Sequence, residues 1–300
     1  MPKIKLIANP VAGRRAPAKI RAAENWLRQN GADVDLTLTR ARGDARAAAA
    51  DARHKDFHRI IAAGGDGTLN EVINGLAPSP IPLGFLPLGT TNVFALEAGI
   101  PFAVEAACAI ALAGEVRPIC LGMAGESRFL LMAGIGFDAD VVYGINLRLK
   151  RLVGKLAYLA GGFAALWRRA PLPVEVETED GRVYRGFNTV IGNGRLYGGG
   201  FSLTPQASLT ANRLDLCLLL RPGRFSLLRC AAGFAAGRPP GPQAALCLQG
   251  REFTVRGGQA PVQIDGDYLG RLPMTFRAVF GDISMVFPPP GEKSEKEGRG

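Results

Sequence analysis

The sequence contains few of the residues that build disulfide frameworks and histidine-based sites. Its 300 residues include five cysteines and two histidines. The cysteines are scattered, odd in number and form no Cys-x-x-Cys pair, so we expect reduced thiols. The two histidines, His54 and His58, have no third ligand nearby in the sequence, so we expect exposed side chains and neither a zinc site nor a catalytic triad.

Long apolar runs are also lacking. No uncharged apolar stretch reaches the roughly 18 residues that a membrane-spanning helix needs. The chain enters the apolar segment Lys3–Ala8 without the charged-then-apolar pattern of a signal peptide. We therefore expect a cytoplasmic protein with no membrane-spanning segment.

Positive charge is in excess. Lys and Arg outnumber Asp and Glu by 36 − 26 = 10. This charge attracts nucleic acid, nucleotides or anionic membrane surfaces without choosing among them. The 47% hydrophobic content supports substantial cores, and the length favours two domains.

Strand and helix patterns alternate up to about residue 120, which predicts an open, mostly parallel α/β domain over residues 1–120. The expected strands are Lys3–Ala8, Val34–Thr39, His58–Ala63 and a segment around Pro82–Phe85; the expected helices are Pro17–Asn30, Gly43–His54, Leu69–Leu76 and Phe102–Ala113.

The pattern then changes to short β-rich segments, and we predict a C-terminal antiparallel β-sandwich-like domain over residues 121–290. Its expected strands are Pro173–Glu179, Gly186–Ile191, Leu214–Leu220, Phe253–Val255, Val262–Ile264 and Pro273–Val279. Residues 291–300 are charged and contain glycine, which predicts a disordered tail.

The turn Gly64-Gly65-Asp66-Gly67-Thr68 lies between a predicted strand and a predicted helix. Glycines let main-chain N–H groups approach an anion, and the helix N-terminus adds partial positive charge. An Asp beside phosphates usually implies a divalent cation between them. Taken alone, the same turn is equally well explained as a tight connection into a helix.

Two more glycine-containing polar loops follow other predicted strands: Asn9-Pro10-Val11-Ala12-Gly13 and Leu88-Gly89-Thr90-Thr91-Asn92. In an open α/β sheet, loops at the carboxyl ends of strands converge on one crevice. We therefore expect these three loops to meet.

Five blocks of sequence, in this order, resemble the lipid kinase family that contains bacterial diacylglycerol kinases and sphingosine kinases. The blocks are Asn9-Pro10 with Gly13, Gly64–Thr68, Leu88–Asn92, Gly134-Ile135-Gly136-Phe137-Asp138-Ala139, and Asp265-Gly266-Asp267. The resemblance implies an active site between a nucleotide domain and a β-rich lipid domain. It also implies ATP and Mg²⁺ as cofactors, with phosphoryl transfer to a hydroxyl of diacylglycerol or a related lipid.

The turn and the resemblance together give a set of expected nucleotide-binding residues. They are Asn9, Thr39, Gly64, Gly65, Asp66, Gly67, Thr68, Leu69, Asn70, Glu71 and Thr90. Thr39 is equally well explained as a plain strand-end hydroxyl, and Glu71 as a first-turn charge favourable to the helix dipole.

Asp267 matches the position where this family often carries a Glu proposed as general base. The preceding Asp265-Gly266 also predicts a hairpin turn, and both interpretations can hold together. Asp66 is the second candidate for the base, with the ordering of Mg²⁺ as its main expected role.

Two departures from the family pattern concern metal. Val93 stands where many relatives have an Asp that helps to organise Mg²⁺, and Val93 cannot do this. The other departure is Thr210–Asp215, where relatives often show Asp-Gly before the hydrophobic-Asp pair. By resemblance, Asp215 binds a structural Mg²⁺ together with main-chain carbonyls of Asn212 and Cys217. Without the resemblance, Asp215 is interpreted as a surface strand residue.

Two further patterns have two interpretations each. Leu147–Ala170 has apolar residues at helical spacing with basic residues at both ends, which fits either a packing helix or a helix lying on an anionic membrane. Gly134–Ala139 fits a dinucleotide-binding pattern, but it lies past the midpoint of the chain without a clear strand-helix-strand context, so we do not expect it to bind a dinucleotide. The resemblance implies instead that it lines the cleft between the two domains.

Three functional hypotheses follow: an ATP-dependent lipid kinase, which we favour; an NAD kinase, which shares the Gly-Gly-Asp-Gly-Thr element; and a catalytically silent membrane-binding protein. The favoured hypothesis implies a lipid acceptor, peripheral association with an anionic membrane and no nucleic-acid partner. Sheet edges would allow a homodimer.

Overall fold

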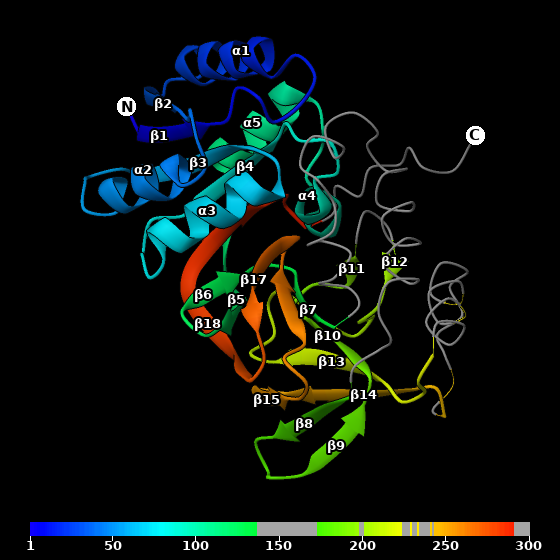
Figure 1. Ribbon diagram of the computed structural model, residues 1–300. Helices are drawn as coiled ribbons and strands as arrows, with labels where there is room; N and C mark the ends of the chain where they lie inside the picture. The colour runs from blue at the N-terminus through cyan, green and yellow to red at the C-terminus, as the bar shows by residue number, and fades with distance from the viewer. Residues whose placement is uncertain are drawn as a thin grey trace. The chain divides into compact units, whose positions relative to one another are not determined.

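A computed structural model describes residues 1–136, 173–197, 201–223 and 243–290, together with residues 229, 233 and 241. The chain divides into two compact units (Figure 1). The first unit is Met1–Ile119 with the C-terminal segment that starts at Gly281, and the second is Cys120–Phe280. The predicted helix Leu147–Ala170 and the predicted tail 291–300 lie outside the described residues.

The first unit contains a parallel sheet in the order β2-β1-β3-β4. Its strands are β1 (Lys3–Ala8), β2 (Asp33–Leu38), β3 (Arg59–Gly64) and β4 (Leu83–Pro87). Strands β1, β3 and β4 are buried along almost their whole length, as expected for a parallel sheet that is covered on both faces. The chain reverses its direction of travel across the sheet at β1, which makes the carboxyl edge beside β1 and β3 a place for ligands.

Five helices of the first unit are described: α1 (Ala16–Gln29), α2 (Asp44–Ala52), α3 (Asp66–Leu76), α4 (Val93–Ala98) and α5 (Val104–Ala113). Helix α1 packs against α5, and α2 packs against α3; Figure 1 shows the two pairs on opposite faces of the sheet. Gly75 permits the close approach of α3 to α2, because a Cβ at this position would overlap the carbonyl oxygen of Arg46.

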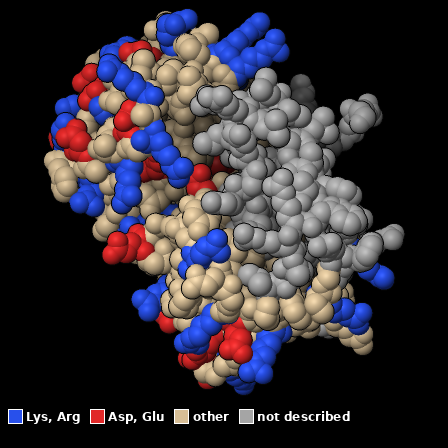
Figure 2. All heavy atoms as spheres, in the orientation of Figure 1, with Lys and Arg blue, Asp and Glu red and all other residues tan. Residues whose placement is uncertain are grey.

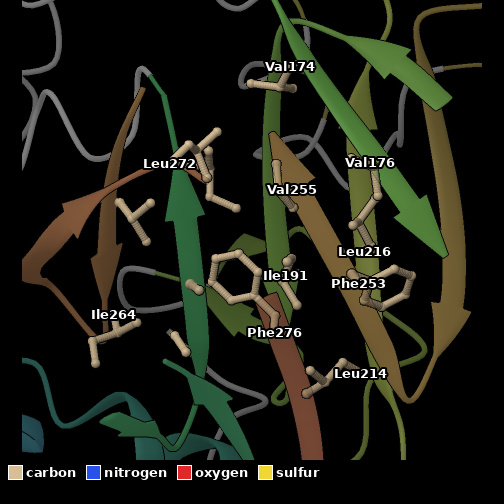
Figure 3. Packing of buried hydrophobic residues seen from close by; sticks show 14 of the residues in the cluster. Val174, Val176, Ile191, Leu214, Leu216, Phe253, Val255, Ile264, Leu272 and Phe276 are labelled. Atoms are coloured by element: carbon tan, nitrogen blue, oxygen red, sulfur yellow. The ribbon is translucent and has the colours of Figure 1, made fainter. Parts of the chain in front are cut away.

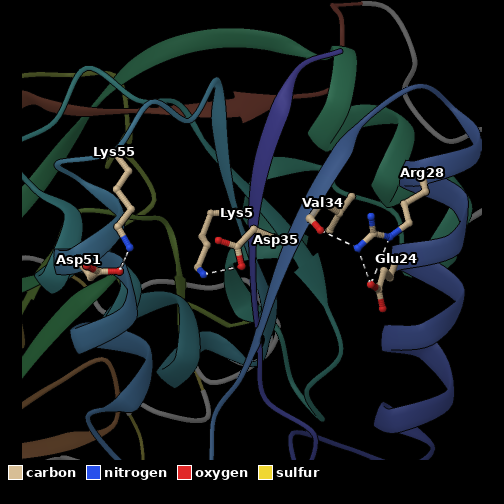
Figure 4. A network of polar contacts seen from close by, with 7 residues as sticks. All are labelled: Lys5, Glu24, Arg28, Val34, Asp35, Asp51 and Lys55. Carbon is tan, nitrogen blue, oxygen red and sulfur yellow. Dashed lines mark hydrogen bonds and ion pairs between the residues drawn. The ribbon is translucent and has the colours of Figure 1, made fainter.

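Polar contacts connect these elements (Figure 4). The ammonium of Lys5, which is buried in β1, pairs with Asp35 of the neighbouring β2 at 2.9 Å. Arg28 of α1 donates to Glu24 at 2.9 Å and to the carbonyl of Val34 at 2.6 Å. The end of α1 is therefore joined to β2.

The second unit is built from antiparallel strands. Its strands are β6 (Ser127–Phe129), β7 (Met132–Ile135), β8 (Val174–Thr178), β9 (Val183–Gly186), β10 (Asn188–Gly192), β11 (Leu196–Tyr197), β12 (Phe201–Ser202), β13 (Leu214–Leu219), β14 (Ala245–Gly250), β15 (Glu252–Arg256), β16 (Pro261–Ile264) and β17 (Asp267–Arg271). Strands β5 (Glu115–Ala124) and β18 (Met274–Phe287) have residues in both units.

Two groups of these strands pack face to face. One is a sheet in the order β14-β13-β10-β7-β16-β17, and the other runs β18-β15-β8-β9. One buried apolar cluster takes side chains from both groups, including Ile191 and Leu216 from the first and Phe253 and Phe276 from the second (Figure 3). The predicted fold class, an α/β unit followed by an antiparallel sandwich-like unit, is confirmed.

The predicted strand Gly186–Ile191 is wrong as a single element. Strand β9 ends at Gly186 and β10 begins at Asn188, and the two belong to different sheets. Gly186 lies against β13 of the sheet that contains β10, because a Cβ on Gly186 would be 2.6 Å from the carbonyl oxygen of Leu219. The close packing of this glycine lets the chain cross between the sheets.

Lys and Arg side chains are spread over the visible surface of both units and are interspersed with Asp and Glu (Figure 2). Within the described ranges, no helix has the length and apolar character needed to cross a bilayer.

Candidate functional site

Three loops meet at the carboxyl edge of the parallel sheet. Asn9, after β1, donates through Nδ2 to the hydroxyl of Thr68 at 3.2 Å. A Cβ on Gly13 would overlap the carbonyl oxygen of Leu88, and a Cβ on Gly89 would lie 2.6 Å from the Cα of Gly65. The predicted convergence of the loops after β1, β3 and β4 is therefore confirmed, and it depends on glycines that let backbone meet backbone.

The turn between β3 and α3 leaves main-chain donors exposed to a ligand. The carbonyl of Gly64 accepts hydrogen bonds from Leu88 N at 2.8 Å and Gly89 N at 3.1 Å, which fixes the turn to the third loop. Helix α3 begins at Asp66 with no side-chain cap, so the first N–H groups of the helix have no intrahelical partner. Open space surrounds the position of a Cβ on Gly67. These features suit an anion.

Asp66 joins this turn to the helix that follows the third loop. Its Oδ2 accepts from Val93 N at 2.9 Å, and its Oδ1 accepts from Phe94 N at 3.0 Å. The carboxylate therefore caps α4 from a different loop. Burial raises the pKa of Asp66, while the hydrogen bonds from Phe94 and Val93 oppose this shift.

Asn92 is a residue of this crevice that the sequence reasoning did not assign. It is buried, with its backbone at φ 49°, and its Nδ2 donates to the carbonyl of Gly89 at 2.8 Å. Its Oδ1 is buried and has no hydrogen-bond partner. A buried acceptor without a donor beside a predicted phosphate turn is a suitable place for a ligand group, a water molecule or a hydrated cation. Its only sequence signal was its place within the Leu88–Asn92 block.

Three expected nucleotide residues are engaged in local contacts. Thr39 is buried at the end of β2, where its N–H donates to the carbonyl of Ala8 at 2.9 Å. Glu71 accepts through Oε2 from Gly43 N at 3.1 Å, so it joins α3 to the loop before α2. The Oδ1 of Asn70 accepts from Asn74 Nδ2 at 3.0 Å. Thr90 lies exposed in the third loop.

The hairpin that carries Asp267 lies in the second unit. Asp265 and Gly266 both have positive φ, 46° and 85°, and Ile264 pairs with Asp267 across the turn. This is the two-residue type I′ geometry that the Asp-Gly pair predicts, so the predicted hairpin is confirmed. Asp267 is exposed at the start of β17.

The carboxylate of Asp265 fixes this hairpin to the entry of β7. It accepts three main-chain hydrogen bonds, from Leu130 at 2.6 Å, Leu131 at 2.9 Å and Met132 at 3.0 Å. The N–H of Gly266 donates to the Gln263 side chain at 2.8 Å. The position of Asp267 is thus set by a carboxylate two residues before it.

Asp215 is not the surface residue that its strand pattern alone indicated. Only 5% of it is exposed, and neither carboxylate oxygen has a hydrogen-bond partner. Burial raises the pKa of Asp215, and the Gln249 side chain and the Arg213 charge oppose the shift only in part. A buried carboxylate without donors fits a bound cation.

The other expected metal ligands offer main-chain oxygens. Asn212 lies just before β13, and the carbonyl of Cys217 accepts a hydrogen bond from the Thr189 hydroxyl at 3.1 Å. The described part of the chain holds no group of three or more His, Cys, Asp or Glu side chains that could bind a metal. A cation at Asp215 would therefore depend on one carboxylate, carbonyls and water.

The pairing of β7 agrees with the expectation that Gly134–Ala139 is not a dinucleotide-binding turn, for the part that is described. Gly134 lies in β7, which pairs antiparallel with β10 and β16 and is not part of a strand-helix-strand unit. Residues 137–139 lie outside the described residues.

Comparisons with known proteins agree with this architecture. A family model described as the diacylglycerol kinase catalytic domain matches residues 3–124, and one described as the YegS C-terminal NAD kinase beta sandwich-like domain matches residues 132–287. The diacylglycerol kinase of Bacillus subtilis (strain 168) is 33% identical over 305 residues, which cover 99% of this chain and 99% of that protein. A probable lipid kinase YegS-like from Pseudomonas putida is 39% identical over 208 residues, 68% of this chain and 70% of that protein.

Solved structures support the fold. The crystal structure of a diacylglycerol kinase from Bacillus anthracis str. Sterne has a TM-score of 0.79 at 24% identity, covering 96% of this chain and 97% of that one. An NAD kinase from Archaeoglobus fulgidus in complex with ATP has a TM-score of 0.52 at 14% identity, with 96% and 93% covered. The similarity to NAD kinase is therefore distant.

Proposed function

The chain belongs to the family of diacylglycerol kinases and YegS-like lipid kinases, and from this premise we propose that it transfers the γ-phosphoryl group of ATP to a hydroxyl of diacylglycerol or a related lipid. That it is a lipid kinase follows from the family; the donor and the acceptor are the proposal. The single observation that supports it best is the meeting of three glycine-containing loops at the carboxyl edge of the parallel sheet.

In the proposal, these loops bind the phosphates of ATP. Phosphoryl transfer depends mostly on positioning and on neutralising charge. The N–H groups of Gly64–Thr68 and the start of α3 supply donors, and Asn9 and Thr90 supply polar side chains from the neighbouring loops. In the proposal, Thr39, Asn70 and Glu71 lie around the nucleotide and support the loops through their contacts with Ala8, Asn74 and Gly43.

Asp267 is the proposed general base, which accepts the proton of the lipid hydroxyl. Its exposure and its fixed position after Asp265-Gly266 are consistent with this role. Asp66 is less suited to it, because each of its oxygens already accepts a main-chain hydrogen bond. The remaining lone pairs of Asp66 are available to order a hydrated cation.

Mg²⁺ is proposed at two places. Beside the phosphates, Asp66 and the unpartnered Oδ1 of Asn92 would contact its water shell, since Val93 has no carboxylate to offer. At β13, Asp215 would bind a structural cation with the carbonyls of Asn212 and Cys217. When bound at the phosphates, Mg²⁺ would neutralise the charge that develops during transfer.

We assign nucleotide binding to residues 1–120 and lipid binding to residues 121–290, with peripheral attachment to an anionic membrane surface. The net charge of +10 supports such attachment.

The decisive experiment incubates the protein with [γ-³²P]ATP and Mg²⁺ in separate reactions with diacylglycerol, sphingosine, phosphatidylglycerol and NAD. We expect label in a lipid product and none in NADP. Label in NADP, or in no acceptor, would overturn the proposal. Loss of lipid labelling in Asp267→Asn, with ATP binding retained, is the expected signature of the general base; retained turnover would remove Asp267 from the mechanism.

A further inference from the structure

Two cysteines that form no disulfide occupy directly opposite positions in neighbouring antiparallel strands. Cys217 of β13 pairs with Cys247 of β14. Cys217 is buried, whereas Cys247, on the edge strand β14, is exposed. The side chain of Cys217 lies close enough to that of Cys247 to interact with its sulfur. One sulfur is therefore accessible to solvent while it contacts a second, protected sulfur.

The main-chain groups of Cys217 point away from β14. Its carbonyl accepts from the Thr189 hydroxyl of β10 at 3.1 Å, and β10 lies on the other side of β13. The carbonyl of Leu219, two residues further on, likewise accepts from Phe187 N at 2.9 Å, on the β10 side. Because orientation alternates along a strand, Cys217 and Leu219 share this direction.

The β14 side of the ladder gives the same result. Leu220 N donates to the carbonyl of Ala244 at 2.9 Å, so the main-chain groups of Leu220 point toward β14. Because this direction alternates along the strand, the main-chain groups of odd-numbered residues such as Cys217 point away from β14. Cys217 and Cys247 are thus a non-hydrogen-bonded pair. In such pairs the Cα atoms are about 4.5 Å apart and the side chains come closest. This separation falls within the range of roughly 4.4–6.8 Å found for disulfides.

We propose that Cys217 and Cys247 are a redox-sensitive pair that forms a reversible disulfide when the protein meets a peroxide. The Cys247 sulfur attacks a peroxide oxygen, the O–O bond breaks, and Cys247 becomes a sulfenic acid as one water leaves. The Cys217 sulfur then attacks the Cys247 sulfur, the S–O bond breaks, and a second water leaves as the S–S bond forms. The two thiols lose two protons and two electrons, which hydrogen peroxide takes up in becoming two waters.

The oxidised form would fasten the edge strand β14 to β13. Strand β13 also carries the buried Asp215, two residues before Cys217. Oxidation of the cysteine pair would therefore constrain the strand that holds this carboxylate. A disulfide with one exposed sulfur is readily reduced, which suits a regulatory rather than a permanent bond. The inference depends on the strand register and not on the lipid kinase proposal.

The test treats the full-length protein with hydrogen peroxide, blocks free thiols with N-ethylmaleimide and maps non-reduced peptides by mass spectrometry. We expect a linked species that joins the peptides of Cys217 and Cys247, two hydrogen masses lighter than their sum and separated by dithiothreitol. Cys108 and Cys120, which are buried, should remain free for alkylation after unfolding.

Variants sharpen the result. Cys217→Ser should abolish the link and leave Cys247 as a sulfenic acid that dimedone traps, whereas Cys108→Ser, a buried thiol of the first unit, should leave the link intact. The wild-type map decides the matter if Cys217→Ser does not fold. Further oxidation of Cys247 with Cys217 still free, a link between two chains through Cys247, or a link to another cysteine would overturn the proposal.

Discussion

Asp66 accepts hydrogen bonds through both carboxylate oxygens, and these contacts bear on the role that it can play. The sequence presented Asp66 as a carboxylate beside phosphates, suited to a cation or to a proton. The structure adds that Val93 N and Phe94 N are its donors, so it also fixes the third loop to the phosphate turn. One residue therefore combines an electrostatic role with a positioning role.

Asp66→Asn should disturb the third loop, because an amide can accept through only one atom and sets a donor against the other N–H group. We expect kcat/KM to fall by on the order of 10²-fold, as displacements near 1 Å do in active sites. Steady-state kinetics with ATP and the lipid acceptor measure the effect. Asp56→Asn, an exposed aspartate away from the three loops, should change little; an equal loss in both variants would contradict the role given to Asp66.

Asp215→Asn should stabilise the protein when EDTA removes divalent cations, because it replaces a buried carboxylate that has no donors. The expected gain is about 1–3 kcal/mol, measured by urea unfolding. Without ATP, Mg²⁺ should stabilise the wild type more than the variant, which keeps only the site proposed beside the phosphates. Equal stabilisation of both proteins by Mg²⁺ would contradict a cation site at Asp215.

The stability difference between the wild type and Asp215→Asn should depend on pH, in a direction set by the pKa of Asp215. Burial raises the pKa of Asp215 in the folded state above its ordinary value of 3.8, so folding favours the protonated form. Below that value the carboxyl is neutral in both states and the wild type and Asp215→Asn should differ least. As the pH rises through the folded-state pKa the wild type loses stability relative to the variant, and the gap in EDTA should widen.

At the scale of whole loops, glycine matters because it has no side chain and lets neighbouring loops approach closely. Gly13 and Gly89 lie where backbone meets backbone at the sheet edge, and at both positions a Cβ would overlap atoms of a neighbouring loop. The sequence showed that these loops contain glycine but not which loop each glycine would face.

Gly89→Ala should force the loops apart, because its Cβ would lie 2.6 Å from both the Asn92 Oδ1 and the Gly65 Cα. Overpacking of this kind typically costs about 1–3 kcal/mol. If the crevice alone absorbs this cost, ATP binding becomes weaker by roughly 5-fold to 150-fold. Isothermal titration with a non-hydrolysable ATP analogue measures the change. Gly270→Ala, which has open space around the new Cβ, is the matched control, and an unchanged ATP affinity in Gly89→Ala would show that the loops do not bind the nucleotide.

Asp265→Ala should loosen the hairpin, because three main-chain N–H groups lose their charged acceptor. We expect a loss of about 3 kcal/mol in unfolding free energy, since hydrogen bonds to charged groups contribute about 1.5–3 kcal/mol each and water recovers part of the total. Urea denaturation gives the value. Asp180→Ala, at the exposed turn between β8 and β9, should cost much less, and equal losses would refute the special role of Asp265.

At the level of the whole protein, positive charge is the feature that the proposal connects with membranes. The basic residues around the start of Leu147–Ala170 are the sequence-based candidates, and their positions lie outside the described residues. Replacing Arg148, Lys150, Arg151 and Lys155 with Gln should reduce sedimentation with anionic vesicles, because each basic residue near such a surface contributes about 1 kcal/mol.

Neutral phosphatidylcholine vesicles and high salt serve as controls for this experiment, since both should remove the difference between the wild type and the variant. Unchanged sedimentation with anionic vesicles would leave the segment as a packing helix.

Much of the fold could be predicted because hydrophobic periodicity and turn chemistry are local properties. The strand Lys3–Ala8 and the Asp265-Gly266 hairpin follow from such signals, and both are confirmed. The crossing between sheets at Gly186 was missed because it depends on packing against Leu219, which is distant in the chain. Burial of Asp215 was missed for the same reason, since a single polar residue in an apolar strand gives no sign of what covers it.

The sequence by itself determined which chemical groups the protein has and the order in which they occur: three glycine-containing loops, the carboxylate of Asp66 in one of them, and a β-rich second half. These features can be predicted because turn chemistry and hydrophobic periodicity depend on residues that are near one another in the sequence. Only the tertiary structure decided the partners, namely that Asp66 caps α4, that Asp265 holds the entry of β7, and that Cys217 lies opposite Cys247. Partners are set by strand order and register, which arise from contacts between segments far apart in the chain.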